Sequence, residues 1–183
     1  MWGNGKPLRP DNEYRKKAET YKRAWKPYEQ KILTGMTDTI DLSFNQNTID
    51  VYIAPWVYAF SDPMVIGVIF DPDWFIDILT HELIHRLLTD NTAVPTELLL
   101  IPHWEKLFGR QQNWNTLIHI PVHATHKAIY LDVLKEPIRL KRDIEKHEKH
   151  NNKDYLAAWD YIEDKNYKQI INQLKEMYSE LKN

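Results

Sequence analysis

The chain has 183 residues, a length typical of one domain or of one domain with an appendage. Hydrophobic residues make up 43% of it, including seven Trp and ten Tyr, which predicts a folded core and excludes a disordered chain. The formal net charge is -2 at pH 7, with acids and bases interspersed. This balance gives no electrostatic case for nucleic acid or an anionic membrane as the main partner.

Cysteine is absent, which excludes disulfides, thiolate zinc sites and a cysteine nucleophile, and favours a reducing compartment. No apolar segment typical of a signal peptide is present in the N-terminal stretch MWGNGKPLRPDNEYRKK. No run approaches the roughly 18 apolar residues of a membrane span. These features predict a cytoplasmic protein whose partner is neither a membrane nor a nucleic acid.

An amphipathic helix is expected over residues 11–33, with a kink at Pro27. Its apolar residues recur every three or four positions: Tyr14, Ala18, Tyr21, Trp25, Tyr28 and Ile32. The period then changes to two in TIDLSF (39–44) and TIDVYIA (48–54), which predicts a hairpin across the Asn-Gln-Asn sequence between them. A third strand, MVIGVIF (64–70), follows the expected loop PWVYAFSDP, so the three strands should form a small sheet.

The stretch DPDWFIDILTHELIHRLLTDN predicts a helix that begins with Pro72 after the N-cap Asp71 and ends near residues 89–90. Further helices are expected over residues 95–109, 121–136, 138–150 and 154–181. The sequence thus predicts an α+β fold. Residues 1–137 would form the main domain, and residues 138–183 a helical hairpin packed on the same domain.

The sequence HELIH places His81 and His85 four residues apart in this helix, with Glu82 directly after the first histidine. Residues i and i+4 lie one turn apart on the same face, so both imidazoles can bind one tetrahedral metal ion. Glu82 lies about 100° around the helix from His81, a position that suits a general base acting on metal-bound water. The motif therefore predicts a catalytic zinc site that needs one further protein ligand.

The motif helix is apolar on almost every side, which indicates a central and buried position. Two imidazoles and a carboxylate need partners in such a place, and a metal ion would supply them. The alternative is a pair of core histidines satisfied by hydrogen bonds. Asp77, one turn before His81, is expected either to orient a ligand or to act as a first-turn acid that favours the helix dipole.

HELIH, and the order of a helix, three short strands, the motif helix and a further helix, resemble the minimal gluzincin scaffold of the zincin metallopeptidases. The resemblance covers about residues 11–135, and only the five-residue motif is specific. It implies that His81 and His85 bind zinc, that Glu82 is the general base, and that an edge strand pairs with an extended peptide. The strand MVIGVIF is the candidate edge, where Gly67 would allow close backbone approach; the alternative is an ordinary core strand.

The third zinc ligand must come from outside the motif helix, and the motif lacks the H-x-x-G-x-x-H extension of metzincins. Gluzincins carry a glutamate on the next long helix, and VHATHKAIYLDVL resembles that pattern with His123 in the glutamate position. If Pro121 is the first helical residue, His119 stays in the preceding loop and His123 falls in the first turn. The expected metal ligands are therefore His81, His85 and His123, with His119, His126 and Glu97 as alternatives for the third.

Other residues near the expected site carry weaker signals. Tyr130 lies seven residues past His123, where it would either hydrogen-bond an oxyanion or pack as a core aromatic. His103 is expected at the surface or in the core. The charged segment IRLKRDIEKHEKH is expected to be a solvated helix, because its acids nearly cancel its bases.

Together these patterns predict a zinc-dependent hydrolase, specifically a metallopeptidase, with Zn²⁺ as cofactor and a peptide or protein as substrate. Glu82 would take a proton from zinc-bound water, which attacks the carbonyl, and would then protonate the departing amine. The alternative is a regulatory or toxin-like binding module in which zinc is structural and held by four protein ligands.

Overall fold

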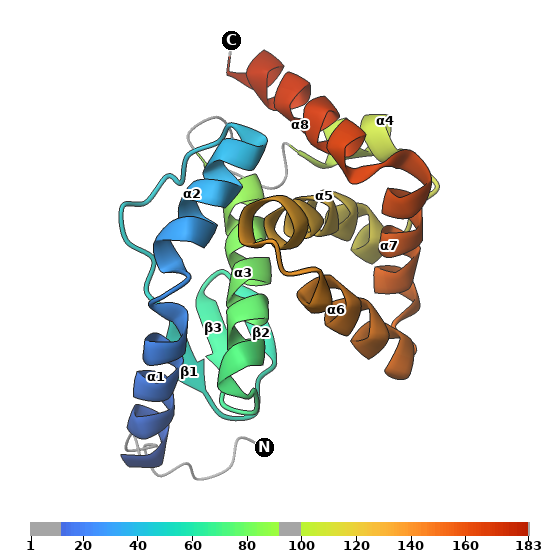
Figure 1. Ribbon diagram of the computed structural model, residues 1–183. Coiled ribbons are helices and arrows are strands. Elements are labelled where there is room, and N and C mark those ends of the chain that lie inside the picture. Colours follow the sequence, from blue (N-terminus) through green and yellow to red (C-terminus); the bar gives the residue numbers. More distant parts are fainter. Residues whose placement is uncertain (1–11, 92–99, 183) are drawn as a thin grey trace, which may run out of the picture.

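The computed structural model describes residues 12–91 and 100–182 and confirms an α+β fold. Its first two helices are α1 (Asn12–Trp25) and α2 (Glu29–Ile40). The chain turns between them around Pro27, where the sequence predicts a kink. Figure 1 shows these helices along one side of the molecule, with the small sheet beside α1.

The second helix extends further than the sequence pattern predicts. Ile32, Met36 and Ile40 recur every four residues and are fully buried on one face of α2. The left-handed Asp41, with φ 58°, then ends the helix. The predicted strand over residues 39–44 is therefore wrong, because the period of four that buries this helix outweighs the short alternation at its end.

The sheet has three short strands, β1 (Tyr52–Ala54), β2 (Ala59–Ser61) and β3 (Met64–Gly67), in the order β1-β3-β2. β3 pairs in parallel with β1 and antiparallel with β2. A three-stranded sheet is as predicted, but the hairpin expected from the first two alternating segments is wrong. β2 lies instead in the segment expected to be a loop, where three residues are too short to show a period.

The central strand of the sheet is β3, so the expectation that it forms an edge is wrong. A Cβ atom at Gly67 would lie 2.2 Å from the carbonyl oxygen of Val57. Glycine is therefore required here by the chain's own backbone, which passes close to the end of β3. Among the described strands, the two edges are β1 and β2.

The motif helix is α3 (Pro72–Thr89), and it begins as predicted. The Asp71 carboxylate accepts hydrogen bonds from the backbone N–H groups of Asp73 and Trp74 at 3.0 and 2.9 Å. The helix passes through the middle of the molecule (Figure 1), where it packs on α1 and the sheet and, further along, on the later helices. It is buried over most of its length, as its apolar sequence predicts.

The second half of the chain is helical. It contains α4 (Ile101–Phe108), α5 (Trp114–Ala128), the π-helix η2 (Ile129–Leu134), α6 (Pro137–Lys149), α7 (Lys153–Lys165) and α8 (Tyr167–Leu181). The predicted end of a helix at Gly109 and the helix over 138–150 are confirmed. The last predicted helix is divided at Asn166, which has φ 66°. No helix among the described residues combines the length and apolar character that crossing a membrane would require.

The start of α5 differs from the prediction. The Asn113 side chain caps the helix by accepting a hydrogen bond from the Thr116 backbone N–H at 2.9 Å. Pro121 lies inside the helix, where its lost hydrogen bond costs roughly 3 kcal/mol. Burial of most of α5 against α3, α7 and α8 offsets this cost. His119, expected in a preceding loop, is therefore part of the helix.

Candidate metal centre

Three histidines from two helices converge on one point. His81 and His85 of α3 and His119 of α5 each offer a ligand atom, and these atoms lie within 4.8 Å of one another. The Nε2 atoms of His81 and His85 are 3.2 Å apart, close to the spacing of about 3.3 Å between two nitrogens bound to one tetrahedral zinc ion. The three residues could hold a metal ion in common.

The ring distances agree with a shared ion. Imidazoles that radiate from one tetrahedral metal through Nε2 place their ring centres about 5 Å apart. The ring centroids of His81 and His85 are 4.8 Å apart, and those of His119 lie 5.4 Å from His81 and 4.9 Å from His85. Both the ligand atoms and the rings behind them are thus arranged around a common centre.

His119 is held in an orientation that suits a metal ligand. Its Nδ1 lies 2.6 Å from the backbone carbonyl oxygen of Asn115, one turn earlier on α5. An N–H at Nδ1 donates to that carbonyl and leaves the lone pair on Nε2. This Nε2 is buried and has no hydrogen-bond partner among the described residues. A metal ion would provide the missing partner.

Burial keeps these imidazoles neutral. It lowers the pKa of His81 well below the ordinary value, that of His85 to about 3 and that of His119 to about 4. The neighbouring histidines lower the pKa of His81 further. All three rings are therefore uncharged at neutral pH, which is the form that binds a metal ion.

His123, the third ligand expected from the sequence, is not in this group. Its ring stacks on Trp159 with centroids 4.3 Å apart, and lies 5.4 Å from the ring of His119. His126 packs against Tyr130, with ring centroids 4.1 Å apart. The nitrogens of both histidines have no hydrogen-bond partner among the described residues.

The preference for His123 over His119 came from the gluzincin-like pattern and from a helix start at Pro121, and the structure corrects the helix start. Because α5 begins earlier, His119 and His123 lie one turn apart on the same helix, and His119 is the one that meets the motif. Glu97, the acidic alternative, lies outside the described residues. His103, on α4, does not belong to the histidine group.

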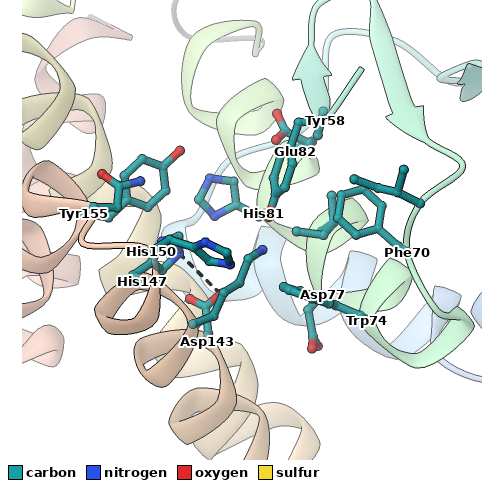
Figure 2. A pocket seen from close by; sticks show the side chains of 15 residues that line it. Tyr58, Phe70, Trp74, Asp77, His81, Glu82, Asp143, His147, His150 and Tyr155 are labelled. Atoms are coloured by element: carbon teal, nitrogen blue, oxygen red, sulfur yellow. Dashed lines mark ion pairs between the residues drawn. The ribbon is translucent and has the colours of Figure 1, made fainter. Parts of the chain in front are cut away.

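Glu82 lines a cavity beside this centre. The cavity has a volume of about 530 Å³, and His81 is also in its wall. Figure 2 shows both side chains on α3, facing residues of α6 and α7 across the cavity. Burial raises the pKa of the Glu82 carboxyl to about 7. The carboxyl can therefore both accept and release a proton near neutral pH.

The charged helix α6 forms the opposite wall. Its residues Asp143, Lys146 and His147, and His150 directly after it, line the cavity, although the sequence predicts only a solvated helix here. Asp143 is buried, and its carboxylate lies 3.7 Å from Nε2 of His147 (dashed in Figure 2). The spacing of three and four residues between these side chains is a helical-face signal that the balance of charges concealed.

A tyrosine at the site was also missed by sequence reasoning. Tyr155 of α7 lines the cavity, and its ring lies 3.9 Å from that of His119. Burial, and then the charges of Glu82 and Asp143, raise the pKa of its hydroxyl. Tyr130 is a core residue with 1% exposure, which is one of the two roles expected for it.

Asp77 has a partner that the sequence did not indicate. Its carboxylate accepts a hydrogen bond from Arg139 Nη1 at 2.8 Å and a second from Arg142, both on α6. It points away from His81 in Figure 2. Burial raises the pKa of Asp77 to about 6 and the two guanidinium groups oppose that rise, so the group is ionised at neutral pH.

Comparisons of the chain with known protein families, with curated proteins and with solved structures found no match. The resemblance to zincins therefore remains an expectation drawn from the motif and the order of elements. The functional assignment rests on the residues of this chain alone.

Proposed function

We propose that this protein is a zinc-dependent hydrolase, specifically a metallopeptidase, with His81, His85 and His119 as metal ligands. The supporting observation is the convergence of three neutral imidazoles beside a carboxyl group that lines a cavity. A zinc ion bound there would polarise a substrate carbonyl and lower the pKa of a water molecule to about 7. Three protein ligands are typical of catalytic zinc sites, which keep a position free for water or substrate.

Glu82 is the proposed general base. Its pKa, raised to about 7 by burial, is close to the value at which a group both takes and gives a proton efficiently at neutral pH. In this role Glu82 takes a proton from the attacking water and passes it to the departing amine. The proposed role of Tyr155, which lines the same cavity, is to donate a hydrogen bond to the oxygen of the carbonyl under attack.

The sheet supports a peptide as the substrate. Tyr58 and Ala59, at the start of the edge strand β2, line the cavity that contains Glu82. Of the two sides of β2, one pairs with β3. An extended peptide added to the other side would have its backbone bound by main-chain hydrogen bonds and would lead into the cavity. β2 thus takes the role that the sequence suggested for β3.

Measurements of metal content, peptide cleavage and melting temperature on the whole chain test the proposal. Protein purified without chelator is expected to hold about one zinc per chain by elemental analysis, and to cleave members of a peptide library. A chelator should abolish cleavage and added zinc should restore it. Glu82→Gln, which removes the base but no metal ligand, should keep the zinc and the melting temperature while lowering turnover by roughly 100-fold or more.

The outcomes separate catalysis from a structural metal. A protein that holds zinc but cleaves no peptide would favour the binding-module alternative. His123 is the nearby candidate for a fourth ligand that closes such a site, because its ring lies 5.4 Å from His119 and 5.7 Å from His81. A wild-type protein without any transition metal after reconstitution would contradict both readings.

A further inference from the structure

The ammonium group of Lys146 lies against an aromatic wall of the cavity. Its Nζ is 3.7 Å from the ring centroid of Trp74, 4.6 Å from that of Tyr58 and 5.9 Å from that of Phe70. The rings also pack edge to face, with Phe70 5.0 Å from Tyr58 and 5.7 Å from Trp74. Figure 2 shows the three rings together on one side of the cavity. Cation–π contacts hold the charge in this place.

Lys146 has no carboxylate partner among the described residues. No acid lies within 4.0 Å of its Nζ, and burial alone accounts for the fall of its pKa to about 8. The group still carries its charge at neutral pH. An ammonium has three N–H donors, and aromatic faces satisfy only its charge, not those donors.

Within the described part of the chain, none of the three acids that line the cavity, Asp77, Glu82 and Asp143, pairs with Lys146. Asp77 pairs with Arg139 and Arg142, and Asp143 lies beside His147. Lys146 is the one lysine or arginine among the described residues that line the cavity. A half-buried cation, fixed in position and without an acceptor, is therefore left facing the space that a ligand would fill.

We propose that Lys146 binds a carboxylate of the ligand, so that this cavity selects peptides carrying an acidic group close to the bond that is cleaved. The carboxylate would come either from an Asp or Glu side chain or from the C-terminus of the peptide. His81 and Glu82 line the same cavity, which limits the distance between the acidic group and the candidate metal centre. The inference about cleavage rests on the proposed hydrolase function; the binding of a carboxylate does not.

The test measures binding by isothermal titration calorimetry to the full-length chain carrying Glu82→Gln, which prevents turnover. Blocked hexapeptides with one Glu moved along the sequence are compared with the same peptides carrying Gln, and the Gln peptide is also tested with a free C-terminal carboxylate. The best acidic peptide is expected to bind about tenfold more tightly or better than its neutral counterpart, as one charge-assisted hydrogen bond provides. Whether the Glu or the C-terminal series shows this ratio identifies the source.

Variants of α6 assign the effect to Lys146. Lys146→Met keeps the apolar stem on the aromatic wall and should reduce the ratio of the dissociation constants of the neutral and the acidic peptide to about one. Lys146→Arg should retain most of this ratio. Lys149→Met, at an exposed position on the same helix, is the matched control and should retain all of it. Melting temperatures verify that each variant is folded.

The same titrations with chelator-treated protein exclude the metal as the carboxylate-binding group, because selectivity through Lys146 persists without it. Equal affinity for acidic and neutral peptides, no binding of any acidic peptide, or a ratio unchanged in Lys146→Met would overturn the inference. So would a preference for peptides with Lys in place of Glu, which would assign the aromatic wall to a cationic ligand. Cleavage by the unmodified chain is measured separately. If the chain cleaves peptides but does not prefer acidic ones, this inference is refuted and the hydrolase proposal is not. If the chain prefers acidic peptides but cleaves none, the hydrolase proposal is refuted and this inference is not.

Discussion

His119 and His123 lie one turn apart on α5, but their imidazoles contact different partners. His119 is oriented by the carbonyl of Asn115 and directs its free nitrogen at the motif histidines. His123 is fully buried and lies flat on Trp159, with 11° between the planes. A ligand oriented by a hydrogen bond to its other nitrogen binds metal more tightly, so the two histidines should differ in their importance for zinc.

His119→Ala is expected to raise the zinc dissociation constant by 10-fold or more, because it removes one of three ligands. His123→Ala should have a smaller effect on zinc affinity, and should destabilise the core through the cavity left beside Trp159. His103→Ala is the matched control, since this histidine lies outside the group. Competition with a chromogenic chelator gives the three constants. A larger loss of zinc affinity in His123→Ala than in His119→Ala would instead support the ligand set that the sequence suggested.

At the scale of elements, a network of charges connects the motif helix to the opposite cavity wall. Arg139, with a side chain 4% exposed, reaches Asp77 at 2.8 Å and Asp73 at 2.7 Å, both on α3. Its Nε also donates to Glu136 at 2.6 Å. The network places the first turns of α3 beside the start of α6. The network therefore connects two elements, α3 and α6, whose residues line the cavity.

Arg139→Met should lower the free energy of unfolding by about 3 kcal/mol, because it leaves the buried carboxylate of Asp77 with one guanidinium instead of two. Lys141→Met, which breaks an exposed pair with Glu145 on the same helix, should cost less than about 1 kcal/mol. Urea unfolding measures both.

The loss of unfolding free energy caused by Arg139→Met should depend on pH. Asp77 has a folded-state pKa already raised to about 6, and loss of Arg139 raises it further. A group whose pKa is higher in the folded state than in the unfolded state contributes stability at low pH that is lost as the pH rises through the folded value. The free energy of unfolding of the variant should therefore be further below that of the wild type at pH 8 than at pH 5. Equal deficits at the two pH values would contradict this account of Asp77.

At the scale of the whole molecule, the segment 138–182 packs against the helices that carry the candidate ligands. The Asp154 carboxylate accepts hydrogen bonds from Asn113 and Asn115 at the start of α5. The Tyr178 hydroxyl donates to the carbonyl of Leu88, near the end of α3, at 2.7 Å. α7 and α8 both pack on α5. The two predicted parts of the chain should therefore fold as one unit.

The wild-type chain is expected to unfold in a single transition, with coincident urea midpoints for tryptophan fluorescence and far-ultraviolet circular dichroism. A chain that ends at residue 137 should lack fixed tertiary structure and bind zinc at least 10-fold more weakly, because α5 loses the helices that bury it. Two separate transitions, or a truncated chain with wild-type zinc affinity, would instead indicate that residues 1–137 are independent.

The sequence by itself determined the α+β class, the start of α3 at its Asp71 cap and the spacing of His81, Glu82 and His85, because these follow from local periods and capping chemistry. Only the tertiary structure decided that β2 is the edge beside the cavity and that His119 meets the motif. Both depend on contacts between segments far apart in the chain, and the burial of α5 overrides the local signal of Pro121. The cavity face of α6 was likewise decided by packing, since its alternating charges look solvated until the helix packs against α7 and η2.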